Sequence, residues 1–443
     1  EAQASLAAGR PAVALAFARE AAHYAASIAQ MGVLANALQI EARALWRLGE
    51  ADAAAEALHR GREALDRNDD AAIRERYLAE FALAESELLS TRTPAAAVPA
   101  IADAERRLRT NVGQRLVALS VLEARVFRRL GNAEAARAAL LKGVALVEAQ
   151  QAQIGQADFL PSFVDASWDV FSEFVDLEAA AGRHADALGW LDRGFDIRRR
   201  WAGGAAPGSL VEVSGGGPLV TWLSRPDGLW IWVVEDGAVD ARHVAVGADV
   251  LARRAARLSY VLTLDAAPDA VDEAVRAIAR DVWWPIAGRL ARGGETARRV
   301  ALVPDPVLQR VPFALLPWSP VEEDLVVDRT ATVLCPSLFA CRAGATALPA
   351  AARVSALHAG QGGAGFAVLP AARDEAERVG RRYAGAAVAA ATETAFAAAL
   401  VSADVVHFSG HAVPDERYPG RSELLLATAA GDGVRVPLAR LFG

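Results

Sequence analysis

The sequence is short of several residue types, and each shortage excludes a class of protein. Lys142 is the only lysine among 47 basic residues, and the formal net charge is −7 with no basic block. Such a chain lacks the positive surface of a nucleic-acid binder, so we expect no nucleic-acid partner. No apolar run reaches the roughly 18 residues that cross a bilayer, and the N-terminus has no signal-peptide pattern. We therefore expect a soluble, cytoplasmic protein with no membrane partner.

Cysteine is also scarce, which limits disulfides and metal sites. Only Cys335 and Cys341 occur, six residues apart. Two cysteines are too few for a disulfide framework or for a zinc site built from two CxxC pairs. This usage fits a reducing cytoplasm.

The first part of the chain has a helical pattern. With 443 residues, 53% of them hydrophobic, the sequence is long enough for two or three domains. Up to about residue 200, apolar residues recur every three or four positions, and β-branched runs are rare. This pattern predicts an α-helical domain over residues 1–200.

A repeated phrase divides this domain into helical hairpins. Each copy is a helix end, a turn residue and a helix start rich in alanine. The turn residues are Gly9, Gly49, Thr91, Gly131 and Gly182, spaced by 40, 42, 40 and 51 residues. Glycine supplies the left-handed cap, and alanine lets the next helix pack closely.

The hairpin pattern resembles tetratricopeptide repeats, because Trp46, Leu48, Gly49 and the following alanines stand in that family's order. The spacing exceeds the usual period of about 34 residues, so we predict a tetratricopeptide-like solenoid with long helices. An irregular helical bundle is the alternative. Repeat arrays present concave surfaces that usually bind protein, so we expect a protein partner or protein substrate here.

Glycine and proline clusters at residues 201–208 and 215–218 end the helical pattern, and we predict a second domain over residues 209–443. The sequence pattern in the first part of this domain predicts a β-meander followed by two helices. The expected strands are 219–223, 229–234 and 239–246, and the expected helices are 249–262 and 269–292.

Strands and helices alternate in the rest of this domain. The expected strands are 299–303, 324–334, 354–358 and 405–409, and the expected helices are 373–383 and 393–400. Residues 424–426 and 437–441 predict one more strand and helix. Such alternation predicts an α/β domain with a mostly parallel sheet, and ligands of such sheets lie beyond the carboxyl ends of the strands.

Two motifs in this domain mimic binding sites. Residues 360–365 match GxGxxG after a strand, but no helix begins at Gly365 and no acidic residue closes a second strand. We predict a flexible loop and no nucleotide cofactor. His407 and His411 would lie roughly 13 Å apart on an extended strand, too far to share one metal ion. We therefore predict no metal and no cofactor.

His411 is the candidate for chemistry. It comes just past the carboxyl end of an apolar strand and behind Gly410, where a substrate would lie, and an imidazole suits general acid or base catalysis. The alternative is an ordinary loop histidine. We expect His407 to point into the sheet region as a structural residue. Asp404 stands at the other end of the strand, roughly 20 Å away at 3.3 Å per residue, and cannot orient His411.

Several blocks in the second domain, taken together, resemble the CHAT domain family. The blocks are residues 282–290, 300–317, 335–338, 369–375, Thr392 and 404–411. Their order and spacing fit over about residues 217–443. CHAT domains commonly follow tetratricopeptide arrays, which agrees with the separate interpretation of the first 200 residues.

The resemblance implies a caspase-like cysteine peptidase fold, with a catalytic histidine after one strand and a catalytic cysteine after the next. By this resemblance His411 is the catalytic base, and the N–H of the following residue helps to hold the oxyanion. That residue is Ala412, where the family usually has glycine.

The nucleophile is missing, since no cysteine follows His411. We expect a C-terminally truncated domain and predict that residues 1–443 have no peptidase activity. Cys335 and Cys341 precede the histidine, and we expect both to be structural. The competing hypothesis is a non-catalytic scaffold that only binds protein.

Overall fold

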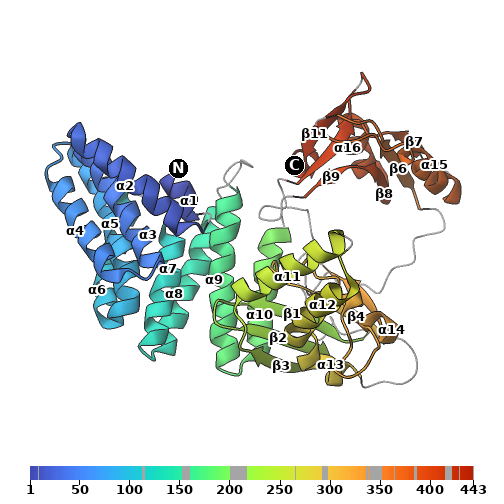
Figure 1. Ribbon diagram of the computed structural model, residues 1–443, viewed down its shortest axis with the longest axis horizontal. Helices are drawn as coiled ribbons and strands as arrows, with labels where there is room; N and C mark the ends of the chain where they lie inside the picture. The colour runs from blue at the N-terminus through green and yellow to red at the C-terminus, as the bar shows by residue number, and fades with distance from the viewer. Residues whose placement is uncertain are drawn as a thin grey trace. The chain divides into compact units, whose positions relative to one another are not determined.

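In the computed structural model the chain forms two compact units, Glu1–Trp190 and Leu191–Gly443 (Figure 1). The structure describes residues 1–7, 9–111, 115–151, 160–199, 217–264, 266–291, 298–335, 338, 352–363, 365–383, 387–414, 422–428 and 430–442. Cys341 and most of the glycine- and proline-rich segment predicted as the domain boundary lie outside these residues.

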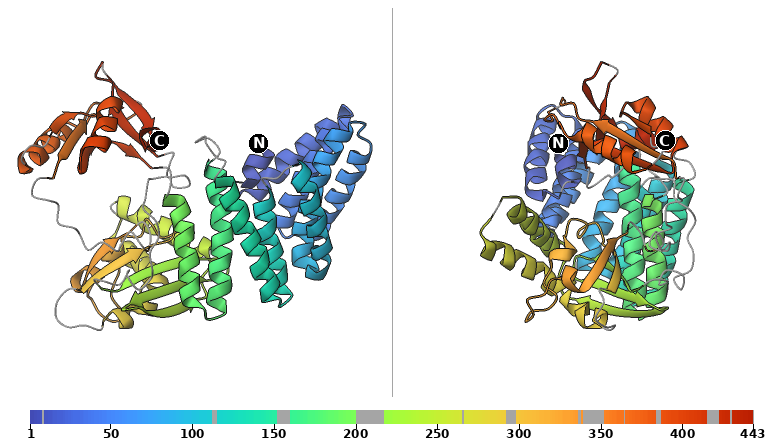
Figure 2. Two further views of the ribbon diagram at one scale, coloured as in Figure 1. Left: turned by 180° about the vertical axis from the view of Figure 1, so that it is seen from behind. Right: turned by 90° about the vertical axis from the view of Figure 1, so that its right-hand side faces the viewer.

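The described residues up to Arg199 are helical, as predicted. The helices are α1 (Ala2–Ala7), α2 (Pro11–Ser27), α3 (Met31–Arg47), α4 (Ala51–Asp66), α5 (Ala71–Arg92), α6 (Pro94–Asn111), α7 (Leu116–Arg129), α8 (Ala133–Gln151), α9 (Leu160–Ala180) and α10 (His184–Arg199). Figures 1 and 2 show helices that follow each other in the first unit packed side by side.

Glycine turns join the predicted hairpins. The four turn glycines adopt positive φ angles, with φ values of +70° at Gly9, +85° at Gly49, +72° at Gly131 and +75° at Gly182. A residue with a Cβ is strained in this left-handed region, which explains the choice of glycine. The copy at Thr91 differs from the prediction. Helix α5 runs on to Arg92, and Thr93 ends it.

Small side chains let neighbouring helices of the first unit approach closely. Buried alanines line α3, α4 and α5 around Leu45, Leu65 and Phe81. At Gly61 a Cβ would stand only 2.5 Å from the Phe81 ring, so the two helices meet where no side chain fits. Tight packing of this kind stabilises the unit more than helix propensity does.

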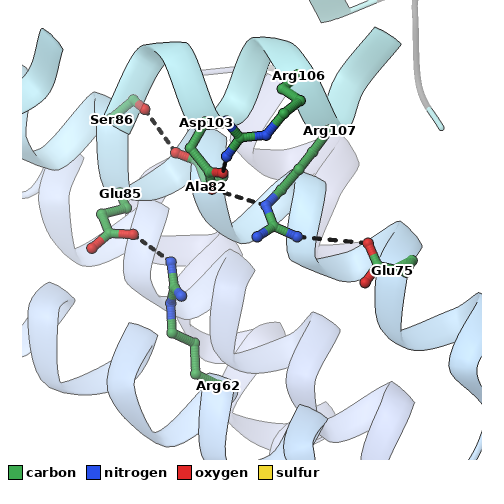
Figure 3. A network of polar contacts seen from close by, with 8 residues as sticks. All are labelled: Arg62, Glu75, Ala82, Glu85, Ser86, Asp103, Arg106 and Arg107. Atoms are coloured by element: carbon green, nitrogen blue, oxygen red, sulfur yellow. Dashed lines mark hydrogen bonds and ion pairs between the residues drawn. The ribbon is translucent and has the colours of Figure 1, made fainter. Parts of the chain in front are cut away.

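Ion pairs lie on the surface of the helices of the first unit. Figure 3 shows Arg62 of α4 against Glu85 of α5, and Asp103 of α6 between Arg106 and Arg107. Partial burial opposes ionisation of Asp103, but hydrogen bonds and charge from the two arginines outweigh it and hold its pKa below the ordinary value. Surface pairs of this type contribute about 1 kcal/mol or less each.

A five-stranded mixed sheet opens the second domain. Its strands are β1 (Leu219–Ser224), β2 (Leu229–Glu235), β3 (Ala238–Val244), β4 (Arg298–Val303) and β5 (Thr330–Leu334), in the order β3-β2-β1-β4-β5. The first three form the predicted antiparallel meander, and β4 and β5 add parallel pairs. Its apolar core includes Trp222, whose Nε1 donates to the Val282 carbonyl at 3.1 Å.

The helices of this part differ from the prediction at two places. They are α11 (Ala248–Thr263), α12 (Pro268–Val282), α13 (Trp284–Leu290), the 3₁₀ helix η5 (Phe313–Leu315) and α14 (Val326–Arg329). The helix predicted over 269–292 breaks at Trp283, because Pro285 starts a new helix. The strand predicted over 324–334 begins only at Thr330, because the Asp328 carboxylate accepts from the Leu325 N–H at 2.7 Å and closes a helical turn.

Two small sheets make up the C-terminal part. The elements are β6 (Val354–Ala359), α15 (Ala372–Arg382), β7 (Ala387–Ala390), α16 (Glu393–Ser402), β8 (Val405–Gly410), β9 (Ala412–Val413), β10 (Glu423–Ala427), β11 (Gly433–Pro437) and α17 (Leu438–Phe442). The order β7-β6-β8 is parallel, and β11-β10-β9 is antiparallel. The α/β class is confirmed, and the described residues form one mixed, one parallel and one antiparallel sheet. None of the helices in the described part of the chain has both the length and the apolar character that crossing a bilayer demands.

Candidate active site

Strand β8 carries the candidate residues, and its two faces differ. Val406 and Phe408 pack into an apolar cluster with α16 and β10. Because successive side chains of a strand alternate, His407 and Ser409 face the other way. Their polar atoms contact α15. The apolar face anchors the strand, and the polar face leads to His411 at its carboxyl end.

The amino end of β8 is fixed by an ion pair. Two nitrogens of the Arg353 side chain contact the Asp404 carboxylate at 2.9 and 3.2 Å, and the Arg353 N–H donates to it at 2.8 Å. The hydrogen bonds from the Arg353 side chain and backbone lower the pKa of Asp404 to about 2. Asp404 therefore stabilises the pairing of β6 and β8 at the end opposite to His411.

The carboxylate of Glu375, on α15, joins the two polar side chains of β8. The Ser409 hydroxyl donates to Oε2 at 2.9 Å, and His407 Nε2 lies 3.1 Å from Oε1. We expected His407 to point into the sheet region, and its side chain lies between β8 and the covering helix α15. The three residues do not form a catalytic triad, because the carboxylate stands between the hydroxyl and the imidazole and Ser409 is buried.

His411 is half-buried just past β8. Its Nε2 lies 2.8 Å from the carbonyl oxygen of Ala367, and its ring centroid lies 4.9 Å from that of Phe366. A carbonyl oxygen only accepts hydrogen bonds, so Nε2 must carry the proton. In the neutral ring Nδ1 then holds the lone pair, which is the form that a general base requires.

The backbone next to His411 provides a hydrogen-bond donor. The Leu425 N–H donates to the His411 carbonyl at 3.0 Å, and Ala412 stands opposite Leu424. Hydrogen-bonded and non-hydrogen-bonded pairs alternate along an antiparallel ladder. The N–H of Ala412 therefore points away from β10.

The GxGxxG segment reaches His411 from the loop after β6. Gly363 and Phe366 exchange backbone hydrogen bonds of 2.9 and 3.2 Å, which fold the segment into a tight turn. Helix α15 begins only at Ala372, so no helix N-terminus stands behind the glycines as a dinucleotide site requires. No three acidic, histidine or cysteine side chains of the described residues gather as a metal site.

Cys335 lies far back in the sequence, directly after β5. It is half-buried, its N–H donates to the Leu302 carbonyl at 2.8 Å, and its sulfur is disulfide-bonded. A sulfur held in a disulfide is not a thiolate nucleophile. Cys341, the other cysteine considered, lies outside the described residues.

A separate cavity of about 430 Å³ lies between α4 and α5 of the first unit. Leucines and an alanine form its apolar part, and charged side chains stand around them. The lining residues are Ala55, Leu58, His59, Arg62, Glu85, Leu88, Leu89, Arg92 and Thr93. Arg62 pairs with Glu85, and Arg92 pairs with the exposed Asp52 at 2.7 Å.

Sequence reasoning singled out His411 but missed the residues that contact it or lie beside it. Glu375 is the last residue of the block at residues 369–375. We used it only as part of that family resemblance and assigned it no role of its own. Phe366 and Ala367 follow the glycines that we treated as a flexible loop. An aromatic residue directly after a glycine-rich turn was the available signal.

The comparison with protein families covers the part of the chain that carries the candidate site. The CHAT domain family model matches residues 272–443, which include β4 to β11, Glu375 and His411. No curated protein matches the chain. Residues 272–443 thus match the CHAT domain family, and the helices α1 to α10 precede this match in the chain.

Proposed function

We propose that this chain carries the histidine half of a caspase-like cysteine peptidase. The observation that supports the proposal is the hydrogen bond between His411 Nε2 and the Ala367 carbonyl. It leaves Nδ1 as the proton acceptor on a ring past the carboxyl end of a parallel strand. Sites of α/β sheets lie at such ends.

The proposed reaction is acyl transfer. Nδ1 of His411 takes the proton of a cysteine thiol, and the thiolate attacks the peptide carbonyl. The imidazolium then gives this proton to the leaving amine, so that an acyl-enzyme remains. Water hydrolyses the thioester, again with the imidazole as base. The N–H of Ala412 donates to the oxyanion.

The proposal requires a cysteine C-terminal to His411, and residues 412–443 contain none. Cys335 precedes β6, and its sulfur is bound in a disulfide. We accordingly expect no peptidase activity from residues 1–443. The competing proposal, a non-catalytic scaffold, predicts another residue in place of that cysteine.

The helical array has the role of recruiting a protein, and the cavity between α4 and α5 is the surface that we propose for it. Leu58 and Leu88 offer an apolar floor, and Arg62 and Arg92 stand around it. Arg62 pairs with the half-buried Glu85 and Arg92 with the exposed Asp52, and exchange of such surface pairs costs about 1 kcal/mol or less. A segment with an apolar side chain next to an acidic one suits this surface.

The catalytic proposal is tested by peptide hydrolysis with a chain that extends past Gly443. Replacing His411 with alanine should reduce kcat/KM by about 1,000-fold or more, because general base and nucleophile act as one unit. His407→Gln is the matched control, since it alters an imidazole on the same strand, and it should retain most of the activity. Equal loss in both variants would count against a special role for His411.

The docking proposal is tested by fluorescence anisotropy with labelled peptides that combine leucine and glutamate. The double variant Arg62→Glu/Arg92→Glu should weaken binding about tenfold or more. Arg60→Glu changes the charge of the same helix outside the cavity lining and should bind as the parent chain does. Binding that responds equally to both changes would mean general charge attraction.

A further inference from the structure

The imidazole of His411 needs more than one contact to hold its orientation. A single hydrogen bond through Nε2 fixes the proton but leaves the ring free to tilt about that bond. A second contact of the ring is with Phe366, at a centroid distance of 4.9 Å and an interplanar angle of 37°.

Phe366 is itself held in place on both its backbone and its ring. Its N–H and carbonyl bond to Gly363, and the Arg435 guanidinium lies over its ring at 5.1 Å from the centroid. Arg435 comes from β11 and also contacts Glu423 of β10 at 3.5 Å. The aromatic ring thus stands between the loop, the hairpin β10–β11 and the imidazole.

The glycines of this loop have a structural reason. Gly363 has a φ of +129°, in the region that residues with a Cβ rarely adopt. A Cβ at Gly362 would stand 2.9 Å from the Phe366 carbonyl oxygen. Glycine is therefore required for the turn that brings residue 366 to His411.

We propose that Phe366 is a positioning residue for His411. Its ring sets the plane of the imidazole so that Nε2–H stays on the Ala367 carbonyl and Nδ1 stays available to a thiol. The two contacts come from consecutive residues, so the loop holds or loses both together. This inference rests on the proposed function and gives the GxGxxG segment a role in orienting the base.

The test measures the tautomer of His411 in residues 1–443 from the ¹⁵N chemical shifts of its ring. The signals of this ring are identified as those that disappear in His411→Gln. The parent chain should show the Nε2–H form. In Phe366→Ala the share of the Nδ1–H form should rise about tenfold, and Phe366→Tyr, which keeps the ring, should restore the parent ratio. Val368→Ala, two residues along the same loop and 63% exposed, should change nothing.

A parent-like tautomer ratio in a folded Phe366→Ala chain overturns the proposal. If that variant does not fold, Arg435→Gln tests the proposal instead, because it removes the cation over the Phe366 ring and leaves the loop sequence intact. It should raise the Nδ1–H share about threefold, and an unchanged ratio overturns the proposal.

Activity provides a second reading that separates this inference from the proposed function. In an active chain that extends past Gly443, Phe366→Ala should lower kcat about tenfold with KM unchanged, and Phe366→Tyr should recover it. Hydrolysis that survives His411→Ala refutes the proposed function but leaves the tautomer result intact. A tautomer ratio independent of Phe366, together with His411-dependent hydrolysis, refutes only the positioning role.

Discussion

The helical array and the C-terminal sheets are stabilised by contacts of different range along the chain. In the array each hairpin closes at a local turn, and successive helices pack on each other. Around the candidate site the decisive contacts are distant, since His411 meets Ala367 across 44 residues and His407 meets Glu375 across 32. The local sequence pattern therefore determines the helical array, whereas the geometry of the candidate site depends on which strands pair.

The two regions also use carboxylates differently. In the array, surface ion pairs such as Arg62–Glu85 join neighbouring helices where water screens them. At β8, Glu375 bridges a buried hydroxyl and an imidazole, and loss of such a partner is more costly. Substitutions in each region should separate these two kinds of stabilisation.

The largest effect should come from filling the close approach of α4 and α5. Gly61→Val places methyl groups where a Cβ alone would already stand 2.5 Å from the Phe81 ring. We expect a loss of about 3 kcal/mol in the free energy of unfolding, measured by urea denaturation. Gly189→Ala is the control, because nothing lies within 4 Å of a Cβ added there and helix propensity should stabilise the variant by up to about 1 kcal/mol.

Removal of the carboxylate beside β8 should have the next largest effect. Glu375→Ala leaves the buried Ser409 hydroxyl without its acceptor and should cost about 1–2 kcal/mol, measured by thermal unfolding. Glu377→Ala, on the same helix, removes a carboxylate that pairs only with the solvent-facing Arg373 and Arg381 among the described contacts, and should change stability by less than about 0.5 kcal/mol. Equal losses would place Glu375 among ordinary surface pairs.

A turn glycine of the array should matter less. Gly49→Ala meets no steric obstacle, since no atom lies within 4 Å of the added Cβ, so only its φ of +85° opposes the change. We expect a loss of about 1 kcal/mol in denaturant unfolding. An unchanged midpoint would mean that the turn relaxes freely and that the repeat does not depend on its glycine.

The smallest effect should appear only in acid. The pKa of Asp404 is lowered to about 2 in the folded protein, so its contribution is present above its unfolded pKa, near 4, and is lost as pH falls towards 2. Asp404→Asn should flatten the pH dependence of stability between about pH 4 and 2. Hydrogen exchange of the backbone amides in β6 and β8 measures this stability. A parent-like pH dependence in the variant would contradict this assignment.

Prediction from the sequence succeeded where the information is local. The helical domain, the turns at Gly9, Gly49, Gly131 and Gly182, and the β-meander follow from periodicity and turn chemistry. Strand β7 was not predicted, because its sequence, Ala387–Ala390, has low β-propensity and gains its structure from pairing with β6. β9 is too short, at two residues, to leave a pattern.

The candidate site could be predicted only in part from the sequence. His411 stood out because it follows an apolar strand and falls in a family block, but its contacts with Phe366 and Ala367 depend on a loop that folds back. Nothing in the local sequence pairs Glu375 with His407 and Ser409, because a helix and a strand must first be packed together. Long-range packing, rather than residue type, decides these contacts.

The most direct test of the central claim is covalent labelling of a chain that extends past Gly443 with a peptide-based electrophile, followed by mass spectrometry. The account predicts one labelled cysteine C-terminal to His411, with labelling reduced at least about 100-fold in His411→Ala and retained in His407→Gln. Labelling that does not depend on His411, or that occurs at Cys335, would contradict it.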